Sequence, residues 1–303
     1  LNEYVRQFPF TIDEAMRDSI EGSTFNIGKI YEQIEYNEEL FPNPVVQGNF
    51  SWKDGVNDKE VIFSPNPQGR WFVSWMPKLE DRNKQILKGN QKHPANDHIG
   101  VGGVDSYDLD STSDNRGSKG ACHMYNKFNM AAPANMFVAE YASRPPLARI
   151  FYEDILMAAV FFGYPLLIEN NKYGIVRHFE ARGYEEYVMK RPEHLKSPNA
   201  SNTKTRGIPS NSVDVIQSHA QAIEAYVEEH VGINSETGEL GKMYFQRTLE
   251  DWIGYKIDNR TKYDLTISSG LALLGAQKSK LVKKSSNFND KQFFRRYSKE
   301  IRR

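Results

Sequence analysis

The pattern of apolar and polar positions is most regular from His98 to Gln277. Apolar runs of strand length predict strands at 99–106, 120–128, 134–142 and 165–169. Helical periodicity predicts helices from Pro145 onward and at 174–182, 212–230 and 264–277. Three consecutive strands, followed by a strand between helices, predict an α/β fold with a mixed sheet covered by helices.

Residues 1–97 follow a different pattern. Thr11 and Glu14 have capping-box spacing, which predicts a short helix. Aromatic-rich segments between Asn, Asp, Gly and Pro residues predict strands at 48–52, 60–64 and 69–75. These strands predict a small antiparallel extension. The polar segment 81–97 is then predicted to connect this extension to the main domain.

Three acidic residues each stand at the tip of an apolar element. Asp105 ends the apolar run 99–104, Glu169 ends the run 165–168, and Asp264 opens an apolar helix. Buried carboxylates are costly unless they are paired or bind a cation, and three that converge repel one another. Oxygen ligands suit Mg²⁺ or Mn²⁺, and a carboxylate cluster can hold two such ions. The three acids therefore predict a two-ion site for metal-assisted phosphodiester hydrolysis.

Each acid taken alone also has a simpler interpretation. Asp105, which precedes a polar loop containing Asp108, fits a carboxylate that caps a turn. Glu169 fits a cap for the helix that starts near Gly174, and Asp264 fits a helix N-cap. Open sheets usually bind ligands at the carboxyl ends of their strands, however, which favours a functional role for Glu169. The simpler interpretation weakens when all three acids are considered together.

Charge and composition add little about partners, except at two segments. Lys plus Arg and Asp plus Glu both number 39, so the net charge is zero. The segment 278–303 carries ten Lys or Arg residues against two acids, and it can contact phosphates or form a solvated tail. The polar segment 196–212 predicts a loop in which Lys204 and Arg206 can hold a polyanion. The apolar stretch 155–168 is too short to span a bilayer comfortably, and no membrane association is predicted.

Other common sites find little support. Cys122 is the only cysteine, so an intrachain disulfide and a Cys-rich zinc site are excluded, and a packing role is predicted. His93 and His98 lie in a polar connection without Cys partners. The segment 238–243 lacks the spacing of a phosphate-binding P-loop, and no secretory signal opens the chain.

The sequences around the three acids form motifs that occur in a fixed order. The motifs are Gly102-Gly103-Val104-Asp105, Leu167-Ile168-Glu169-Asn170-Asn171, and the segment from Tyr263-Asp264-Leu265 to Leu274. They resemble the three motifs of the carboxy-terminal nuclease domain of the large terminase subunit of tailed double-stranded DNA phages. The resemblance covers about 99–277. Two weaker matches support the resemblance. The stretch that follows the family's ATPase domain looks like Phe8-Pro9 with Thr11, Glu14 and Ala15. A loop of the family's nuclease looks like the segment Lys204 to Pro209.

The resemblance implies an RNase H-like fold and a metal-dependent endonuclease that cuts concatemeric viral DNA during genome packaging. It implies that Asp105, Glu169 and Asp264 ligate Mg²⁺ or Mn²⁺, with Asp105 bridging two ions and Asp108 as an outer ligand. The candidate DNA contacts are Lys119, Lys127, Arg144, Lys172, Lys204 and Arg206. Many family members have two adjacent acids at the third motif, whereas Tyr263 precedes Asp264 here, which leaves the number of bound ions open.

The resemblance also implies partners and an organisation for the chain. The implied partners are double-stranded DNA, the portal protein, the small terminase subunit and the family's ATPase domain, in the cytoplasm of an infected host cell. The ATPase motifs are missing, so the chain is expected to start after that domain. Residues 1–97 are then a linker or extension, 98–277 the nuclease domain and 278–303 a basic tail. The isolated chain is expected to be monomeric.

Two other functions compete with a packaging endonuclease. One is another RNase H-like enzyme, such as a junction resolvase or a transposase core, which would prefer branched DNA or join strands. The other is a DNA-binding or portal-docking module with a weak or inactive site. Such a module would bind DNA in the presence of a chelator and cut it with neither metal.

Overall fold

The computed structural model describes residues 24–108, 119–128, 132–192, 195, 206–209, 213–234, 236–257 and 262–277. The strands of the central sheet are β1 (Val46–Trp52), β2 (Val61–Pro65), β3 (Trp71–Val73), β6 (Gly100–Asp105), β7 (Gly120–Asn126), β8 (Met136–Ser143) and β9 (Leu166–Ile168). They form one seven-stranded sheet in the order β2-β1-β3-β8-β7-β6-β9. Neighbouring strands are antiparallel except β6 and β9, which are parallel. The sheet is therefore mixed.

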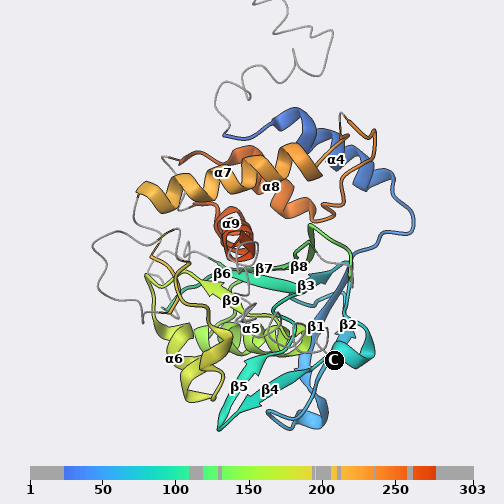
Figure 1. Cartoon of the computed structure of the whole chain (residues 1–303). Coiled ribbons are helices and arrows are strands. Elements are labelled where there is room, and N and C mark those ends of the chain that lie inside the picture. The colour runs from blue at the N-terminus through green and yellow to red at the C-terminus, as the bar shows by residue number, and fades with distance from the viewer. Residues whose placement is uncertain are drawn as a thin grey trace, which may run out of the picture.

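Helices cover both faces of this sheet. The described helices of more than one turn are α4 (Ile27–Glu39), α5 (Ala148–Phe162), α6 (Gly174–Ala181), α7 (Val213–His230), α8 (Gln246–Gly254) and α9 (Asp264–Gln277). Figure 1 shows α5 and α6 on one face, and α9 on the other, between the sheet and the outer helices α7 and α8. Two buried apolar clusters correspond to these two faces, one containing α5 and the other containing α9.

The connection from β8 to β9 passes through α5, which is apolar on nearly every side. Twelve of its fifteen residues are buried, so packing rather than an amphipathic pattern determines its position. The helix ends at Gly163, which has a φ of 68° and donates its N–H to the carbonyls of Ala159 and Val160. A left-handed C-cap of this kind favours glycine, and it turns the chain directly into β9.

The helix α9 lies unusually close to β6 because Gly103 has no side chain. A methyl group at Gly103 would lie 2.2 Å from the backbone nitrogen of Ala272 and 2.2 Å from the carbonyl oxygen of Ser268. At the other end of the contact, a methyl group at Gly275 would lie 2.8 Å from Val101. The later residues of α9 therefore lie over the beginning of β6, which means that α9 runs antiparallel to this strand.

We expect Gly103→Ala to destabilise the protein by about 1–3 kcal/mol, because the added methyl group must push the backbone of α9 away from the sheet. Urea denaturation measures this loss. Gly89→Ala is the comparison, because Gly89 has open space around it but a φ of 61°, so only backbone strain of about 1 kcal/mol is expected there. Equal stability of wild type and Gly103→Ala would contradict the close contact.

Most of the predicted elements from His98 onward are confirmed. The four strands predicted there correspond to β6, β7, β8 and β9, and the predicted helix 264–277 has the same bounds as α9. The coarse prediction of a mixed α/β sheet covered by helices is also confirmed. The helices α4 and α8 are additions that the sequence analysis did not predict.

The part of the chain before His98 differs more from the prediction. The three predicted strands are present as β1, β2 and β3, but β3 pairs with β8, so they enlarge the central sheet. The segment 81–97, which was predicted to connect the extension to the main domain, contains a hairpin formed by β4 (Gln85–Lys88) and β5 (Gln91–Pro94). Their residues are mostly polar and none is buried, so no apolar alternation indicated strands. The predicted helix at Thr11 to Glu14 and the tail 278–303 lie outside the described residues.

Candidate active site

Asp105 and Glu169 lie next to each other at the carboxyl ends of β6 and β9. Val104 pairs with Ile168 in parallel register, and the N–H of Glu169 donates to the carbonyl of Val104 at 2.9 Å. Neighbouring strands lie about 4.8 Å apart, and side chains alternate between the two faces of a sheet. The two acids follow this pair in the same register, so they project from adjacent positions on one face.

That face is the one covered by α9. Val101 and Leu167 belong to the apolar cluster that contains α9, and Asp105 and Glu169 follow them at even spacings of four and two residues. Because α9 runs antiparallel to β6, its first residue, Asp264, reaches the same end of the sheet as Asp105. The structure therefore brings the three predicted acids to one place from three separate elements.

The electrostatic environment of Asp105 agrees with this arrangement. Burial raises the pKa of Asp105 well above its ordinary value, and the negative charge of Glu169, a side-chain hydrogen bond with Glu169 and the charge of Asp264 raise it further. The positive charge of Lys172 acts in the opposite direction. Without a cation, the protein therefore favours a proton on Asp105, because burial and two neighbouring carboxylates both disfavour its charge.

Asp264 is held from outside its own helix. Its Oδ2 accepts the backbone N–H of Lys119 at 2.9 Å. Burial raises the pKa of Asp264, while this hydrogen bond and the charges of Lys172 and Lys119 lower it and the charge of Glu169 raises it. Both lysine side chains are exposed, so their ammonium groups act on the acids from the solvent side.

The donor set fits a hard divalent cation. Among the described residues, no three His, Cys, Asp or Glu side chains are already placed around a point where a metal ion would fit. The three acids nevertheless offer only oxygen donors, and the charges of Glu169 and Asp264 raise the pKa of the buried Asp105. Mg²⁺ or Mn²⁺ would neutralise these charges, since both ions prefer carboxylate oxygens.

Asp108, the candidate outer metal ligand, is engaged with the start of α6. Its Oδ1 and Oδ2 accept the N–H of Gly174 at 3.2 and 3.3 Å, and Oδ1 also accepts the hydroxyl of Tyr152 at 2.9 Å. Gly174 is the first residue of α6. Asp108 therefore acts as a cap for α6, which ties the loop after β6 to the segment that follows Glu169.

The candidate DNA contacts divide into two groups. Lys119 and Lys172 are exposed beside the acids, as described above. Lys127 is buried and its Nζ donates to the carbonyl of Asp97 at 2.7 Å. Arg144 is half-buried and lies over the ring of Tyr107, with 4.4 Å between Cζ and the ring centroid. These two cations are already engaged within the protein.

Arg206 is only 6% exposed and has a structural role. Its guanidinium donates to Glu185 at 2.8 Å, to Glu186 at 2.5 Å and to the carbonyl of Val188 at 2.7 Å. This placement argues against the predicted contact of Arg206 with DNA. Ile208, two residues later, continues the sheet beside β9. Its N–H donates to the carbonyl of Ile168, and its carbonyl accepts the N–H of Asn170. Lys204 lies outside the described residues.

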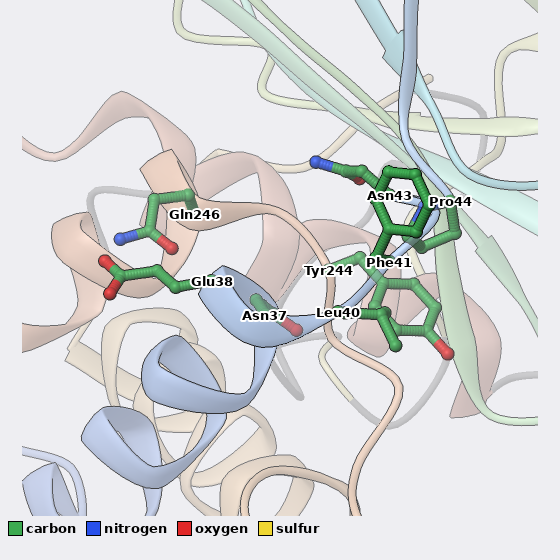
Figure 2. A pocket seen from close by; sticks show the side chains of 8 residues that line it. All are labelled: Asn37, Glu38, Leu40, Phe41, Asn43, Pro44, Tyr244 and Gln246. Atoms are coloured by element: carbon green, nitrogen blue, oxygen red, sulfur yellow. The ribbon is translucent and has the colours of Figure 1, made fainter.

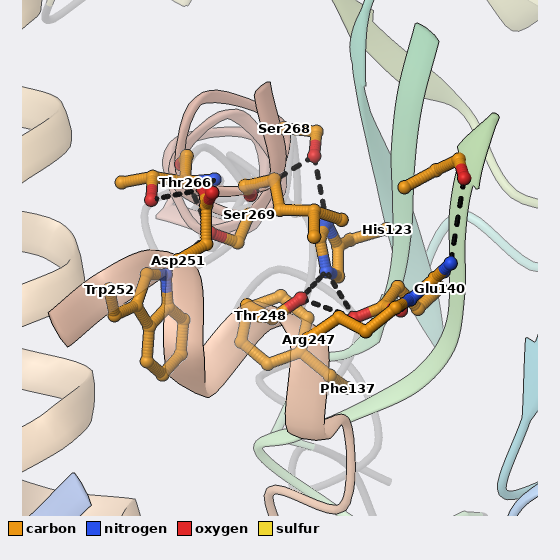
Figure 3. Close-up of polar contacts among 12 residues, drawn as sticks. His123, Phe137, Glu140, Arg247, Thr248, Asp251, Trp252, Thr266, Ser268 and Ser269 are labelled. Carbon is orange, nitrogen blue, oxygen red and sulfur yellow. Dashed lines mark hydrogen bonds and ion pairs between the residues drawn. The ribbon is translucent and has the colours of Figure 1, made fainter. Parts of the chain in front are cut away.

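A buried polar network, which sequence analysis did not identify, connects β7 with α8 and α9. His123 contacts Ser268 Oγ through Nδ1 at 2.9 Å and Thr248 Oγ1 through Nε2 at 2.7 Å, as Figure 3 shows. Thr248 in turn donates to Glu140 at 2.5 Å, and Arg247 pairs with Glu140 at 2.6 Å. Apart from the neighbours Arg247 and Thr248, these five residues are widely separated in the sequence, and their types form no recognised motif, so no sequence signal indicates this network.

A hollow of about 520 Å³ lies between the end of α4 and the start of α8 (Figure 2). Phe41, which is 94% exposed, forms part of its wall together with Leu40 and Tyr244. The lining contains none of the residues predicted for the site.

Cys122 is buried in β7, and burial raises the pKa of its thiol, which confirms the packing role predicted for it. None of the described helices combines the length and the apolar character that crossing a bilayer requires.

Comparison of the chain with models of protein families and with curated proteins yields no match.

Proposed function

We propose that this chain is a divalent-metal-dependent endonuclease with an RNase H-like core, which cuts concatemeric viral double-stranded DNA during genome packaging. The convergence of Asp105, Glu169 and Asp264 at one end of the sheet carries this proposal. The order β8-β7-β6-β9, with β9 alone parallel to β6, supports the RNase H-like core, because it matches three antiparallel strands followed by a parallel fourth. The portal protein, the small terminase subunit and an ATPase domain belong to the same proposal as partners in the host cytoplasm.

The three acids would hold one or two Mg²⁺ or Mn²⁺ ions. Asp105 interacts electrostatically with both Glu169 and Asp264, so it is assigned as the ligand that any two ions would share. Bound ions supply Lewis acidity at the scissile phosphate and lower the pKa of a water molecule that attacks phosphorus. Hydrolysis would form one P–O bond to the water oxygen and break the P–O bond to the 3′ or 5′ oxygen; the attacking water would release a proton to solvent, and the departing oxygen would take one up from solvent.

Lys172 and Lys119 are assigned to the phosphate groups of the substrate. Both are exposed, and both act electrostatically on Asp264. Contacts with phosphates contribute affinity and register without reading bases, so this pair favours cutting with little sequence preference. Lys127, Arg144 and Arg206 are left out of this assignment because their charges are engaged within the protein.

Cleavage of supercoiled plasmid by the purified chain tests the proposal. We expect nicking and linearisation with Mg²⁺ or Mn²⁺, none with chelator, and loss of activity in Glu169→Gln and Asp264→Asn. Glu80→Gln is the matched control, because it removes an exposed carboxylate outside the site and should leave cleavage unchanged. Circular dichroism would verify that each variant is folded.

Other outcomes identify the competing functions. Preferential cleavage of four-way junctions would indicate a resolvase, and joining of DNA ends would indicate a transposase core. DNA binding that persists in chelator, without cleavage by the folded wild type in either metal, would contradict the endonuclease and favour a docking module.

A further inference from the structure

The start of α9 is fastened to α8 by a carboxylate that belongs to a different helix. Asp251 Oδ2 accepts both the backbone N–H and the hydroxyl of Thr266, each at 2.7 Å, as drawn in Figure 3. The first backbone N–H groups of a helix have no partner within the helix. Asp251 therefore does what an N-cap side chain usually does, but from α8 rather than from the chain just before α9.

This cap changes what Asp264 can do. An aspartate at the start of a helix often uses its carboxylate to bind the N–H groups of the first turn. Here Asp251 already accepts the hydrogen bonds of Thr266. The Oδ2 of Asp264 instead accepts the backbone N–H of Lys119, the residue just before β7. The carboxylate of Asp264 is thereby turned away from its own helix and toward the end of β6.

Two further contacts reinforce the cap. The indole N–H of Trp252 donates to Ser269 Oγ at 3.1 Å, and His123 contacts Ser268 Oγ at 2.9 Å. Ser268 and Ser269 are neighbours in α9, and Figure 3 shows Trp252 of α8 and His123 of β7 beside this part of the helix. Asp251 and Trp252 of α8, together with His123 of β7, thus hold the first two turns of α9.

Asp251 also lies close enough to Asp264 for their charges to interact. Burial raises the pKa of Asp251 to about 6, the two hydrogen bonds from Thr266 lower it, and the charges of Asp264 and Glu140 add to the rise. Its carboxylate is nevertheless committed to Thr266, so a direct role as a metal ligand is disfavoured by geometry.

We propose that Asp251 is a positioning residue: it caps α9 from α8 and so keeps the carboxylate of Asp264 directed toward Asp105 and Glu169. The functional part rests on the metal site proposed above. The cap itself does not, because it can be measured in the absence of metal.

Two substitutions separate positioning from charge. Asp251→Ala removes the acceptor, whereas Asp251→Asn keeps a side-chain oxygen that can accept both hydrogen bonds of Thr266 but carries no charge. Glu250→Ala is the matched control, because Glu250 is an exposed neighbour on α8 that contacts only Gln246 among the described contacts, at 3.2 Å. All four proteins are compared in two measurements.

The first measurement is amide hydrogen exchange at Thr266 in chelator. We expect exchange about fivefold or more faster in Asp251→Ala, because losing a cap costs about 1 kcal/mol, with near wild-type rates in Asp251→Asn and Glu250→Ala. The second is Mn²⁺ affinity by calorimetry. We expect a loss of about 10–100-fold in Asp251→Ala, as for residues that orient metal ligands, and rescue in Asp251→Asn.

Each result has a defined meaning. Unchanged exchange in Asp251→Ala overturns the cap. Faster exchange with wild-type Mn²⁺ affinity overturns the positioning role, and equal loss of affinity in Asp251→Asn replaces positioning by charge. If the wild type binds no Mn²⁺ and cuts no DNA, the proposed nuclease fails, and the exchange measurement still decides whether Asp251 holds α9.

Discussion

Asp105→Asn should lower the rate of metal-dependent DNA cleavage by about a thousandfold or more. The charges of Glu169 and Asp264 both act on Asp105, so its substitution removes one of the three proposed metal ligands. Metal-assisted stabilisation of a transition state amounts to several kcal/mol, and each 1.36 kcal/mol corresponds to a factor of ten. Initial rates of plasmid linearisation at saturating Mn²⁺ would measure the loss.

The same variant should be more stable than the wild type in the absence of metal. Burial and two like charges raise the pKa of Asp105, so the unfolded state loses this proton at lower pH than the folded state. The charged form of Asp105 therefore destabilises the folded state increasingly as pH rises above 3.8, the ordinary pKa of aspartate. An uncharged Asn at this position removes that destabilisation. Thermal melting in chelator at pH 8 would test this expectation.

Asp97→Asn is the control for both measurements, because its side chain is 69% exposed and it removes one negative charge close to β6. It should leave the cleavage rate and the metal-free melting temperature unchanged. Wild-type cleavage by a folded Asp105→Asn protein would eliminate the proposed metal site.

His123 should make the folded protein sensitive to acid. Burial and then the positive charge of Arg247 lower its pKa to about 3, whereas an unfolded histidine has a pKa near 6.5. Between these values the unfolded chain binds a proton that the folded state does not, so stability falls as pH decreases from about 6.5 toward 3. The contribution approaches about 4–5 kcal/mol at the acid end, at 1.36 kcal/mol per pH unit.

The measurement is urea denaturation at pH 7.5 and pH 4.5. Between these two pH values, the wild type should lose about 3 kcal/mol more than His123→Gln, because the glutamine does not titrate. The comparison concerns the pH dependence, since His123→Gln also changes contacts with Ser268 and Thr248. His98→Gln is the control, because His98 has 67% of its side chain exposed and its removal should leave the acid loss as in the wild type. Equal losses in the wild type and His123→Gln would contradict a neutral buried histidine.

Sequence analysis identified the acids because each one interrupts a regular pattern. Asp105 and Glu169 end apolar strands, and Asp264 starts a helix whose apolar and small residues mark it as buried. Because β6, β7 and β8 alternate in direction, β8 runs parallel to β6. The helix between β8 and β9 is the crossover connection that parallel strands need, so β9 is expected to run in that same direction. The end of the sheet where the acids meet was therefore accessible from periodicity and from the positions of charged residues.

The surroundings of the site were not accessible in this way. Asp251 and Arg206 look like ordinary surface charges, because only the folded chain shows that one caps α9 and the other binds Glu185 and Glu186 inside the protein. The helix α8 is short, with Thr248, Leu249 and Trp252 buried among nine residues, and it was not predicted from the sequence. Long-range contacts of this kind depend on which elements become neighbours, and local sequence does not contain that information.

Because β3 pairs with β8, a shortened protein that carries the three acids must also contain the strands before residue 98. A protein shortened to residues 98–277 would keep all three acids but would leave β8 without its neighbour. The exposed row of backbone N–H and C=O groups would then be a template for pairing with another molecule. Trp71, which is buried against Tyr141, would also be missing from the core. The strands β1 to β3 are thus part of the smallest unit that can carry the acids in soluble form.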